Sequence, residues 1–263
     1  MQADGGWNSQ LASGFRRLHT APESSREGTT KTQRLLIPGD AGPLEALLEY
    51  DPLIAPRLLA VVCHPHPQYG GTLHNKVVFR VAKAAVRLGI PALRFNFRGV
   101  GESQGTFADG IGERDDVRAV LDYLEIRFPA APVCVMGFSF GAQVGLAAGA
   151  LDPRVGALVG LGVPASASEW GFLAGLSKPT LIVQGTQDNF GPREQVQALF
   201  DALAEPKRIH WVEGADHFFT GRLGEVQAAL RAFLVEIHPG DAPGLPESSQ
   251  KPLASSPLPT EEK

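Results

Sequence analysis

Short apolar stretches alternate with longer amphipathic ones over most of this chain. Short runs rich in Val, Ile, Leu and Phe are typical of strands buried in a parallel sheet, and longer stretches with a helical period indicate helices that cover it. On this pattern we predict strands at 32–37, 44–50, 58–63, 91–97, 132–137, 155–161, 179–184 and 207–212. The corresponding helices are predicted at 74–88, 113–127, 140–150, 193–203 and 220–236.

The order of these elements predicts an α/β fold. Residues 38–42, which read PGDAG, suit a hairpin-like turn between the first two strands. After that turn strands and helices alternate, and this alternation predicts a mostly parallel eight-stranded sheet with helices on both faces. The segment between the sixth and seventh strands, about 162–178, leaves room for little or no lid.

The periodic pattern stops near both ends of the chain. Residues 1–30 are polar and show no clear periodicity, and we expect a flexible leader there. Residues 238–263 are rich in proline and serine, a composition that buries too little surface to fold, so we expect a disordered tail. One folded domain at residues 31–237 remains between them.

Charge, apolar stretches and cysteine positions indicate which binding partners and which cell compartment to expect. The 263 residues carry a net charge of −4 without a dense basic patch, which argues against nucleic acid as the main partner. No apolar stretch approaches the roughly 20 residues of a membrane span. The two cysteines, Cys63 and Cys134, lie in predicted buried strands, so we expect free thiols and a cytoplasmic location. The oligomeric state is left open.

The pattern G-x-S-x-G occurs twice, at Gly101–Gly105 and at Gly137–Gly141. A nucleophilic serine of this kind sits on a sharp turn between a strand and a helix, and the glycines allow the two elements to approach closely. Ser139 has this context because it lies between the strand at 132–137 and the helix at 140–150. Ser103 is followed by a glycine-rich loop, and we interpret it as part of a turn. Ser139 is therefore the predicted nucleophile.

A base and a carboxylate that orients it are expected at the ends of later strands. Asp188 follows the strand at 179–184, and His217 follows the strand at 207–212. The carboxyl ends of parallel strands meet at one edge of a sheet, where ligands bind in folds of this kind. The chain order Ser139, Asp188, His217 is that of a catalytic triad on an α/β sheet. We expect Asp216, next to the histidine, to shape its loop.

The loop at 63–71 is the second candidate feature. An oxyanion formed during acyl transfer needs backbone N–H donors, one from the residue after the serine, Phe140, and one from this loop. Pro65 and Pro67 have no N–H, so His66 is the preferred donor, with Gln68 as the alternative. His64 and His66 have no third metal ligand nearby in sequence, and we expect neither a metal nor a cofactor. His64 is expected to order the loop.

Two longer motifs carry a family resemblance. Residues 64–72 read HPHPQYGGT, and residues 94–103 read RFNFRGVGES. On these motifs the chain resembles the α/β-hydrolase superfamily, within it a group of small bacterial predicted hydrolases related to carboxylesterases and dienelactone-hydrolase-like proteins. The resemblance covers about residues 31–237 and implies the α/β-hydrolase fold, the triad Ser139, Asp188 and His217, and oxyanion donors at Phe140 and His66. Asn96 is a departure, since many members have Asp there.

The sequence thus predicts a serine hydrolase that cleaves a small carboxylic ester, or a related acyl compound, through an acyl-enzyme on Ser139. An acyltransferase on the same scaffold is an alternative, because an alcohol can release the same acyl-enzyme. A catalytically silent binding protein with this fold is another. A dinucleotide-binding oxidoreductase is disfavoured, because the spacing of Gly99, Gly101 and Gly105 does not match G-x-G-x-x-G.

Overall fold

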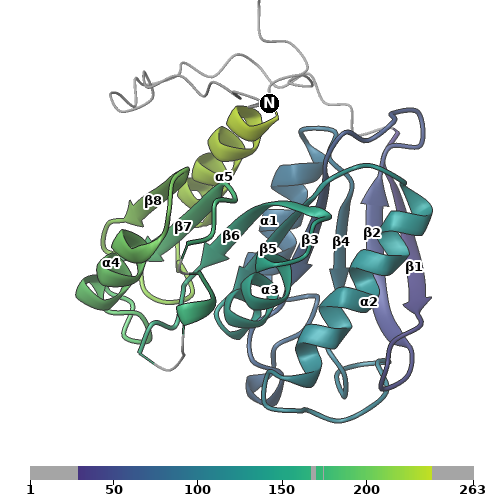
Figure 1. The fold of residues 1–263 in the computed structure, drawn as a ribbon, viewed down its shortest axis with the longest axis horizontal. Helices are drawn as coiled ribbons and strands as arrows, with labels where there is room; N and C mark the ends of the chain where they lie inside the picture. The colour runs from purple at the N-terminus through teal and green to yellow at the C-terminus, as the bar shows by residue number, and fades with distance from the viewer. Residues whose placement is uncertain (1–28, 167–169, 174, 239–263) are drawn as a thin grey trace, which may run out of the picture.

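A computed structural model describes residues 29–166, 170–173 and 175–238. Eight strands form one sheet in the order β1-β2-β4-β3-β5-β6-β7-β8 (Figure 1). Their bounds are β1 (Lys31–Ile37), β2 (Leu44–Tyr50), β3 (Leu59–Cys63), β4 (Ala92–Phe95), β5 (Val133–Phe138), β6 (Val155–Leu161), β7 (Thr180–Gly185) and β8 (Lys207–Val212). The β1–β2 and β2–β4 pairs are antiparallel, and the other pairs are parallel.

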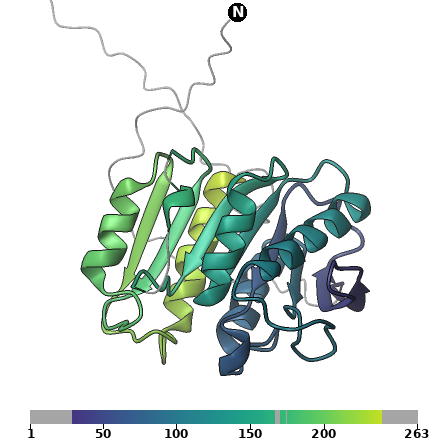
Figure 2. The same ribbon diagram turned by 60° about the horizontal axis from the view of Figure 1, so that its bottom comes forward.

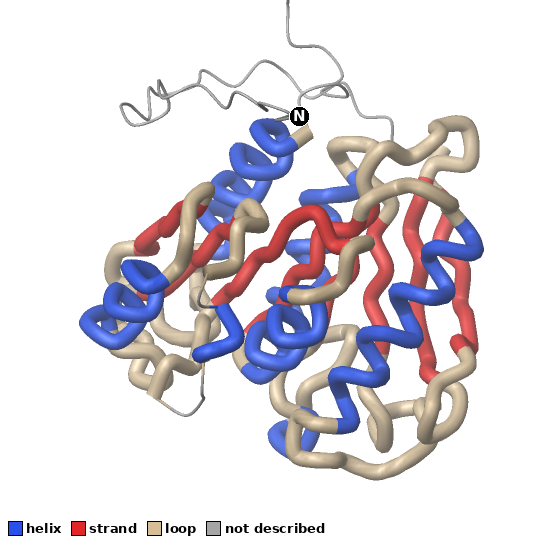
Figure 3. Tube along the Cα trace, viewed as in Figure 1, coloured by secondary structure: helices blue, strands red, loops and turns tan. Residues whose placement is uncertain are grey.

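The helices cover both faces of this sheet (Figures 1 and 2). In the view of Figure 1, α2, α3 and α4 lie in front of the strands and α1 and α5 lie behind them, and Figure 3 shows the same layers by element type. The helices are α1 (Lys76–Val86), α2 (Gly112–Arg127), α3 (Phe140–Ala150), α4 (Arg193–Ala202) and α5 (Leu223–Ile237), with short 3₁₀ helices η1 (Pro67–Tyr69) and η2 (Gly171–Leu173). The predicted α/β fold, with a mostly parallel eight-stranded sheet, is confirmed.

Burial on both faces explains the continuous apolar runs of the central strands. Alternate residues such as Val61 and Val135 pack in the core shared with α2, α3 and α4. Their neighbours, such as Val62 and Met136, pack in the core shared with α1 and α5. Because side chains alternate across a strand, a strand covered twice has no polar face.

The two cysteines take part in this alternation. Cys63 lies in the first core and Cys134 in the second, so the sheet separates two free thiols. Burial raises the pKa of both thiols well above the ordinary range. Each is a small apolar core residue held in the protonated form.

Some element ends differ from the sequence prediction for local reasons. Helix α1 begins at Lys76, because the side chain of Asn75 accepts hydrogen bonds from the N–H groups of Val77 and Val78 and so caps the helix. Helix α5 begins at Leu223, because Asp216 holds the preceding residues in a turn by accepting from the N–H of Thr220.

The regions expected to be flexible fall mostly outside the described residues. Of the expected leader at 1–30, the structure describes residues 29 and 30, and of the expected tail at 238–263 it describes residue 238. Between β6 and β7 the described residues form the short helix η2. Within the described part of the chain no helix combines the length and apolarity needed to cross a membrane.

Candidate active site

Ser139 lies at the sharp turn between β5 and α3. It directly follows Phe138, the last residue of β5, and precedes Phe140, the first residue of α3, with a backbone φ of 56°. A non-glycine residue rarely adopts a positive φ, and such strain is typical of functional turns. A Cβ at Gly137 would lie 2.1 Å from the carbonyl oxygen of Gly141, so the turn requires glycine there.

A chain of hydrogen bonds joins this serine to the ends of β7 and β8. His217 Nε2 lies 2.9 Å from Ser139 Oγ, and His217 Nδ1 lies 2.8 Å from Asp188 Oδ2. A carboxylate only accepts hydrogen bonds, so Nδ1 carries the proton and Nε2 is free to accept the hydroxyl of the serine. Asp188 is 3% exposed and His217 is 7% exposed, which keeps water from competing for these bonds. The structure brings together the three residues selected from the sequence.

Gln184, in β7, is a residue that the sequence prediction missed. Its Nε2 donates to Asp188 Oδ2 at 2.8 Å, and its Oε1 accepts from the N–H of Val163 at 2.7 Å. The other carboxylate oxygen of Asp188 accepts from the N–H of Phe190 at 2.8 Å. These two donors therefore fix both oxygens of the carboxylate independently of the imidazole. A lone glutamine in an otherwise apolar strand was the available signal.

The loop that carries His217 is held by its neighbour. Asp216 Oδ1 accepts from the N–H groups of Phe218 and Thr220, and its Oδ2 accepts from the Thr220 hydroxyl. These bonds lower the pKa of Asp216. This contact pattern agrees with the expectation that Asp216 shapes the loop.

The sequence predicts that the backbone N–H groups of Phe140 and His66 bind an oxyanion. Among the described residues neither Phe140 nor His66 donates its N–H to a protein acceptor. The N–H of the alternative donor, Gln68, points to His66 Nδ1 at 3.3 Å. His66 packs its ring 4.8 Å from that of Phe140, between centroids, so the two residues lie side by side.

His64 fixes the peptide that carries the His66 N–H. Its Nδ1–H donates to the carbonyl oxygen of Pro65 at 2.6 Å, and its Nε2 accepts from the N–H of Phe97 at 3.0 Å. In a trans peptide the N–H points opposite to the carbonyl, so holding the Pro65 oxygen also aims the His66 N–H. Burial lowers the pKa of His64 to about 4 and keeps the ring neutral.

The second G-x-S-x-G motif forms a structural turn. Ser103 is 7% exposed, and its Oγ donates to the carbonyl of Asn96 at 2.7 Å and accepts from the N–H of Glu45 at 2.9 Å. Both bonding directions of the hydroxyl are thus used by backbone groups. The interpretation of Ser103 as a turn residue agrees with these contacts.

Asn96 and Arg98 also hold the loop after β4. The Asn96 side chain accepts from the N–H of Leu73 at 2.8 Å and donates to Glu45 Oε2 at 2.7 Å. An aspartate there would face the glutamate carboxylate, which gives a local reason for the asparagine. Arg98 donates through Nε and Nη2 to Asp116, tying the loop to α2.

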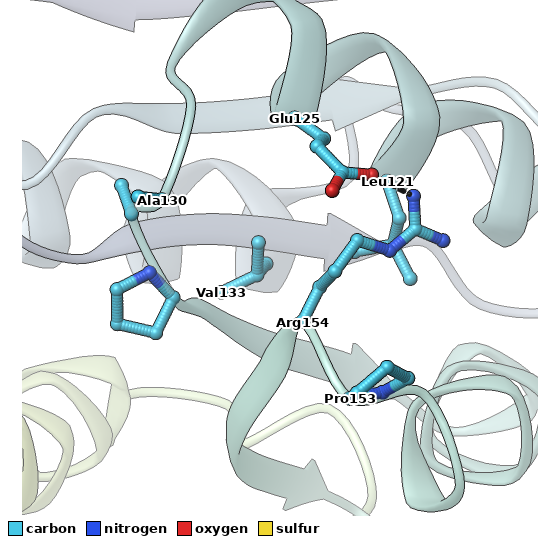
Figure 4. A pocket seen from close by; sticks show the side chains of 8 residues that line it. Leu121, Glu125, Ala130, Val133, Pro153 and Arg154 are labelled. Carbon is cyan, nitrogen blue, oxygen red and sulfur yellow. Dashed lines mark hydrogen bonds and ion pairs between the residues drawn. The ribbon is translucent and has the colours of Figure 1, made fainter.

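The described residues contain no group of metal ligands, but they do form a pocket. None of their His, Cys, Asp and Glu side chains form a group of three or more that could hold a metal. A pocket of about 240 Å³ lies at the amino ends of β5 and β6 (Figure 4), whereas Ser139 follows the carboxyl end of β5. Its Arg154 points toward Glu125 and also pairs with Asp152, so carboxylates already balance its charge.

Comparisons with known proteins agree with the fold. A family model described as "Alpha/beta hydrolase domain" matches residues 69–228. An uncharacterized protein of Rickettsia prowazekii is 36% identical over 188 residues, which cover 68% of this chain and 79% of that protein.

Two solved structures are similar to this chain over most of their own length. A serine hydrolase from Xanthomonas campestris, described as lacking a lid, is 32% identical with a TM-score of 0.73, covering 82% of this chain and 97% of that one. An α/β serine hydrolase homologue from Coxiella burnetii is 39% identical with a TM-score of 0.72, and the match covers 77% of this chain and 97% of that one. The chain therefore belongs to the α/β-hydrolase family.

Proposed function

We propose that this protein is a serine hydrolase that cleaves a small carboxylic ester through an acyl-enzyme on Ser139. The observation that carries the proposal is the continuous hydrogen-bond chain from Ser139 Oγ through the His217 imidazole to the Asp188 carboxylate, at 2.9 and 2.8 Å. A serine hydroxyl is a weak nucleophile until an adjacent base takes its proton, and this arrangement supplies the base.

In the first half of the reaction Ser139 Oγ attacks the ester carbonyl carbon, and its proton passes to His217 Nε2. The carbonyl oxygen becomes an oxyanion, which the N–H groups of Phe140 and His66 would bind. Asp188 stabilises the imidazolium. The imidazolium then gives its proton to the ester oxygen, the carbon–oxygen bond breaks, and the alcohol leaves an acyl group on Ser139.

In the second half a water molecule takes the place of the alcohol. His217 accepts a proton from the water as its oxygen attacks the acyl carbon, and the same two N–H groups bind the second oxyanion. The imidazolium returns the proton to Ser139 Oγ as the acyl–serine bond breaks, which releases the carboxylic acid. One oxyanion donor is worth about 3 kcal/mol in the transition state. The His64 bond to the Pro65 carbonyl supports this role for His66.

Replacement of each motif serine tests the proposal. Ser139→Ala should lower kcat for p-nitrophenyl acetate by at least about 10⁴-fold, because it removes the attacking oxygen. Ser103→Ala should keep most of the turnover and lose about 1–3 kcal/mol of unfolding free energy, because the buried N–H of Glu45 loses its acceptor. Turnover by Ser139→Ala equal to that of the wild type would rule out Ser139 as the nucleophile.

A further inference from the structure

Two exposed aromatic rings lie directly on the catalytic histidine of the proposed site. Phe190, in the loop after β7, is 55% exposed, and its ring centroid lies 4.6 Å from that of His217. Phe218, in the loop after β8, is 57% exposed and lies 5.3 Å from the same imidazole. A single exposed phenylalanine needs no explanation, but two on one imidazole make an apolar surface beside the reacting atoms.

The charges around this surface do not favour an anion. Arg193 lies at the start of α4, shortly after Phe190 in the chain. It pairs with Glu213 and stacks over Trp211. Arg222 lies just before α5, a few residues after Phe218 in the chain, and pairs with Glu225. Each guanidinium group thus has a carboxylate partner of its own.

Carboxylates stand close to the same imidazole. Asp188 bonds it directly, and Asp216 precedes it in the chain with a lowered pKa. Burial also lowers the pKa of His66, whose ring contacts that of Phe140, and this favours the neutral ring. A negatively charged group on the substrate would therefore meet negative charge at this surface, where the two arginines already pair with glutamates.

The chemistry of the reaction decides which half of the ester meets these rings. For the carbon–oxygen bond to break, the leaving oxygen must lie within hydrogen-bond reach of His217 Nε2, which protonates it. The group attached to that oxygen is the alcohol half of the substrate. The alcohol half therefore lies beside the imidazole that Phe190 and Phe218 contact.

We infer that the preferred substrate is an ester of an uncharged, apolar alcohol of about the size of a phenyl ring, which packs on Phe190 and Phe218. This inference rests on the proposed function and adds the chemical class of the leaving group. The two rings are specificity-determining residues for that group. They do not take part in proton transfer.

Matched esters test the inference in the full-length enzyme. Benzyl acetate and ethyl acetate differ in the alcohol, and methyl phenylacetate and methyl acetate differ in the acyl group. 4-Methylbenzyl acetate and 4-carboxybenzyl acetate differ in charge, at similar reactivity of the ester. The wild type should prefer benzyl over ethyl acetate, and the methyl over the carboxy compound, each by about tenfold or more in kcat/KM.

Variants then assign the preference to the two rings. Phe190→Ala and Phe218→Ala should each lower the benzyl-to-ethyl ratio, and the double variant should lower it by about tenfold. The ratio of methyl phenylacetate to methyl acetate should change by less than about twofold. Leu151→Ala is the matched control, because this residue is 88% exposed and follows the far end of α3. It should change neither ratio.

The outcomes separate this inference from the proposed function. An equal fall for benzyl and ethyl acetate in the phenylalanine variants would overturn the inference, since the rings would then serve only the histidine. So would a loss confined to methyl phenylacetate, or equal rates for the carboxy and methyl compounds. A wild type that hydrolyses p-nitrophenyl acetate but none of these esters would also overturn the inference, whereas a wild type that hydrolyses neither would contradict the proposed ester hydrolysis itself.

Discussion

At the scale of single residues, the site depends on how completely its carboxylate is held. Asp188 Oδ2 receives one bond from His217 and one from Gln184, and the glutamine is fully buried. The glutamine in turn is anchored to the backbone of Val163. It is a positioning residue, because it touches the carboxylate and not the hydroxyl that reacts.

Gln184→Met keeps the length of the side chain and removes the amide. We expect kcat to fall by about tenfold or more with little change in KM, because a hydrogen bond to a charged group is lost. Steady-state kinetics together with the melting temperature would check this. Gln197→Met is the control, because Gln197 also donates to an aspartate, Asp201, on the surface of α4. An unchanged kcat at a lower melting temperature would show that Gln184 serves stability alone.

The sequence predicted some site residues better than others. Ser139, Asp188 and His217 could be found because each follows a predicted strand, and the ends of parallel strands converge. Gln184 could not be found in this way, because nothing in a single sequence shows which acceptor a buried amide will meet. The choice of His66 rested on excluding two prolines, and its role as an oxyanion donor remains a proposal.

At the scale of elements, the turn between β5 and α3 is held against a neighbouring strand. A Cβ on Gly141 would lie 2.4 Å from the carbonyl oxygen of Cys63 and 2.5 Å from that of His64. Both carbonyl oxygens belong to the backbone, so they cannot move aside as a flexible side chain could. The helix that follows Ser139 therefore packs directly on the end of β3, from which the loop with His66 departs.

Gly141→Ala should consequently reduce both stability and activity. We expect a loss of about 1–3 kcal/mol of unfolding free energy or more, because the methyl group forces α3 away from β3. Gly224→Ala is the matched control, since nothing lies within 4 Å of a Cβ there and the residue is in α5. That control should gain up to about 1 kcal/mol. Urea unfolding of both variants checks the pair, and equal stabilities would contradict the close approach.

Element boundaries show where sequence reasoning lost detail. The fourth strand was predicted at 91–97, but β4 ends at Phe95. Past Phe95, the Asn96 side chain bonds to the N–H of Leu73 and to the Glu45 carboxylate, and the N–H of Phe97 donates to the His64 ring. Such long-range contacts leave no periodic signal in the chain.

At the scale of the whole molecule, the fold follows from one physical pattern. Strands covered on both faces must be apolar throughout, and helices covering them must be apolar on one side, so the elements could be predicted with nearly their observed bounds. The position of β4 between β2 and β3 could not, because pairing between strands distant in sequence depends on contacts that the hydrophobic pattern does not encode.

The buried His64 links the stability of the whole fold to pH. Its pKa is about 4 in the folded protein against an ordinary value of about 6.5, so the unfolded chain binds the extra proton first as the pH falls. The folded state should therefore lose about 3 kcal/mol from this group between pH 6.5 and pH 4. Its contribution is fully present above pH 6.5.

His64→Asn removes the titrating ring while keeping an N–H donor near the position of Nδ1. Its unfolding free energy should be lower than that of the wild type at neutral pH and should decline less steeply between pH 6.5 and pH 4. Chemical unfolding at a series of pH values in this window measures both slopes. Parallel curves for the two proteins would mean that His64 is not the group responsible.

The most direct test of the account as a whole is covalent labelling with a fluorophosphonate probe, followed by mass-spectrometric mapping of the modified residue. Such probes react with serines whose hydroxyl is activated by a neighbouring base. We expect one adduct per chain, on Ser139, that disappears in Ser139→Ala and forms much more slowly in His217→Ala. A stoichiometric adduct on another residue such as Ser103, or no adduct on the folded wild-type protein, would contradict the central claim.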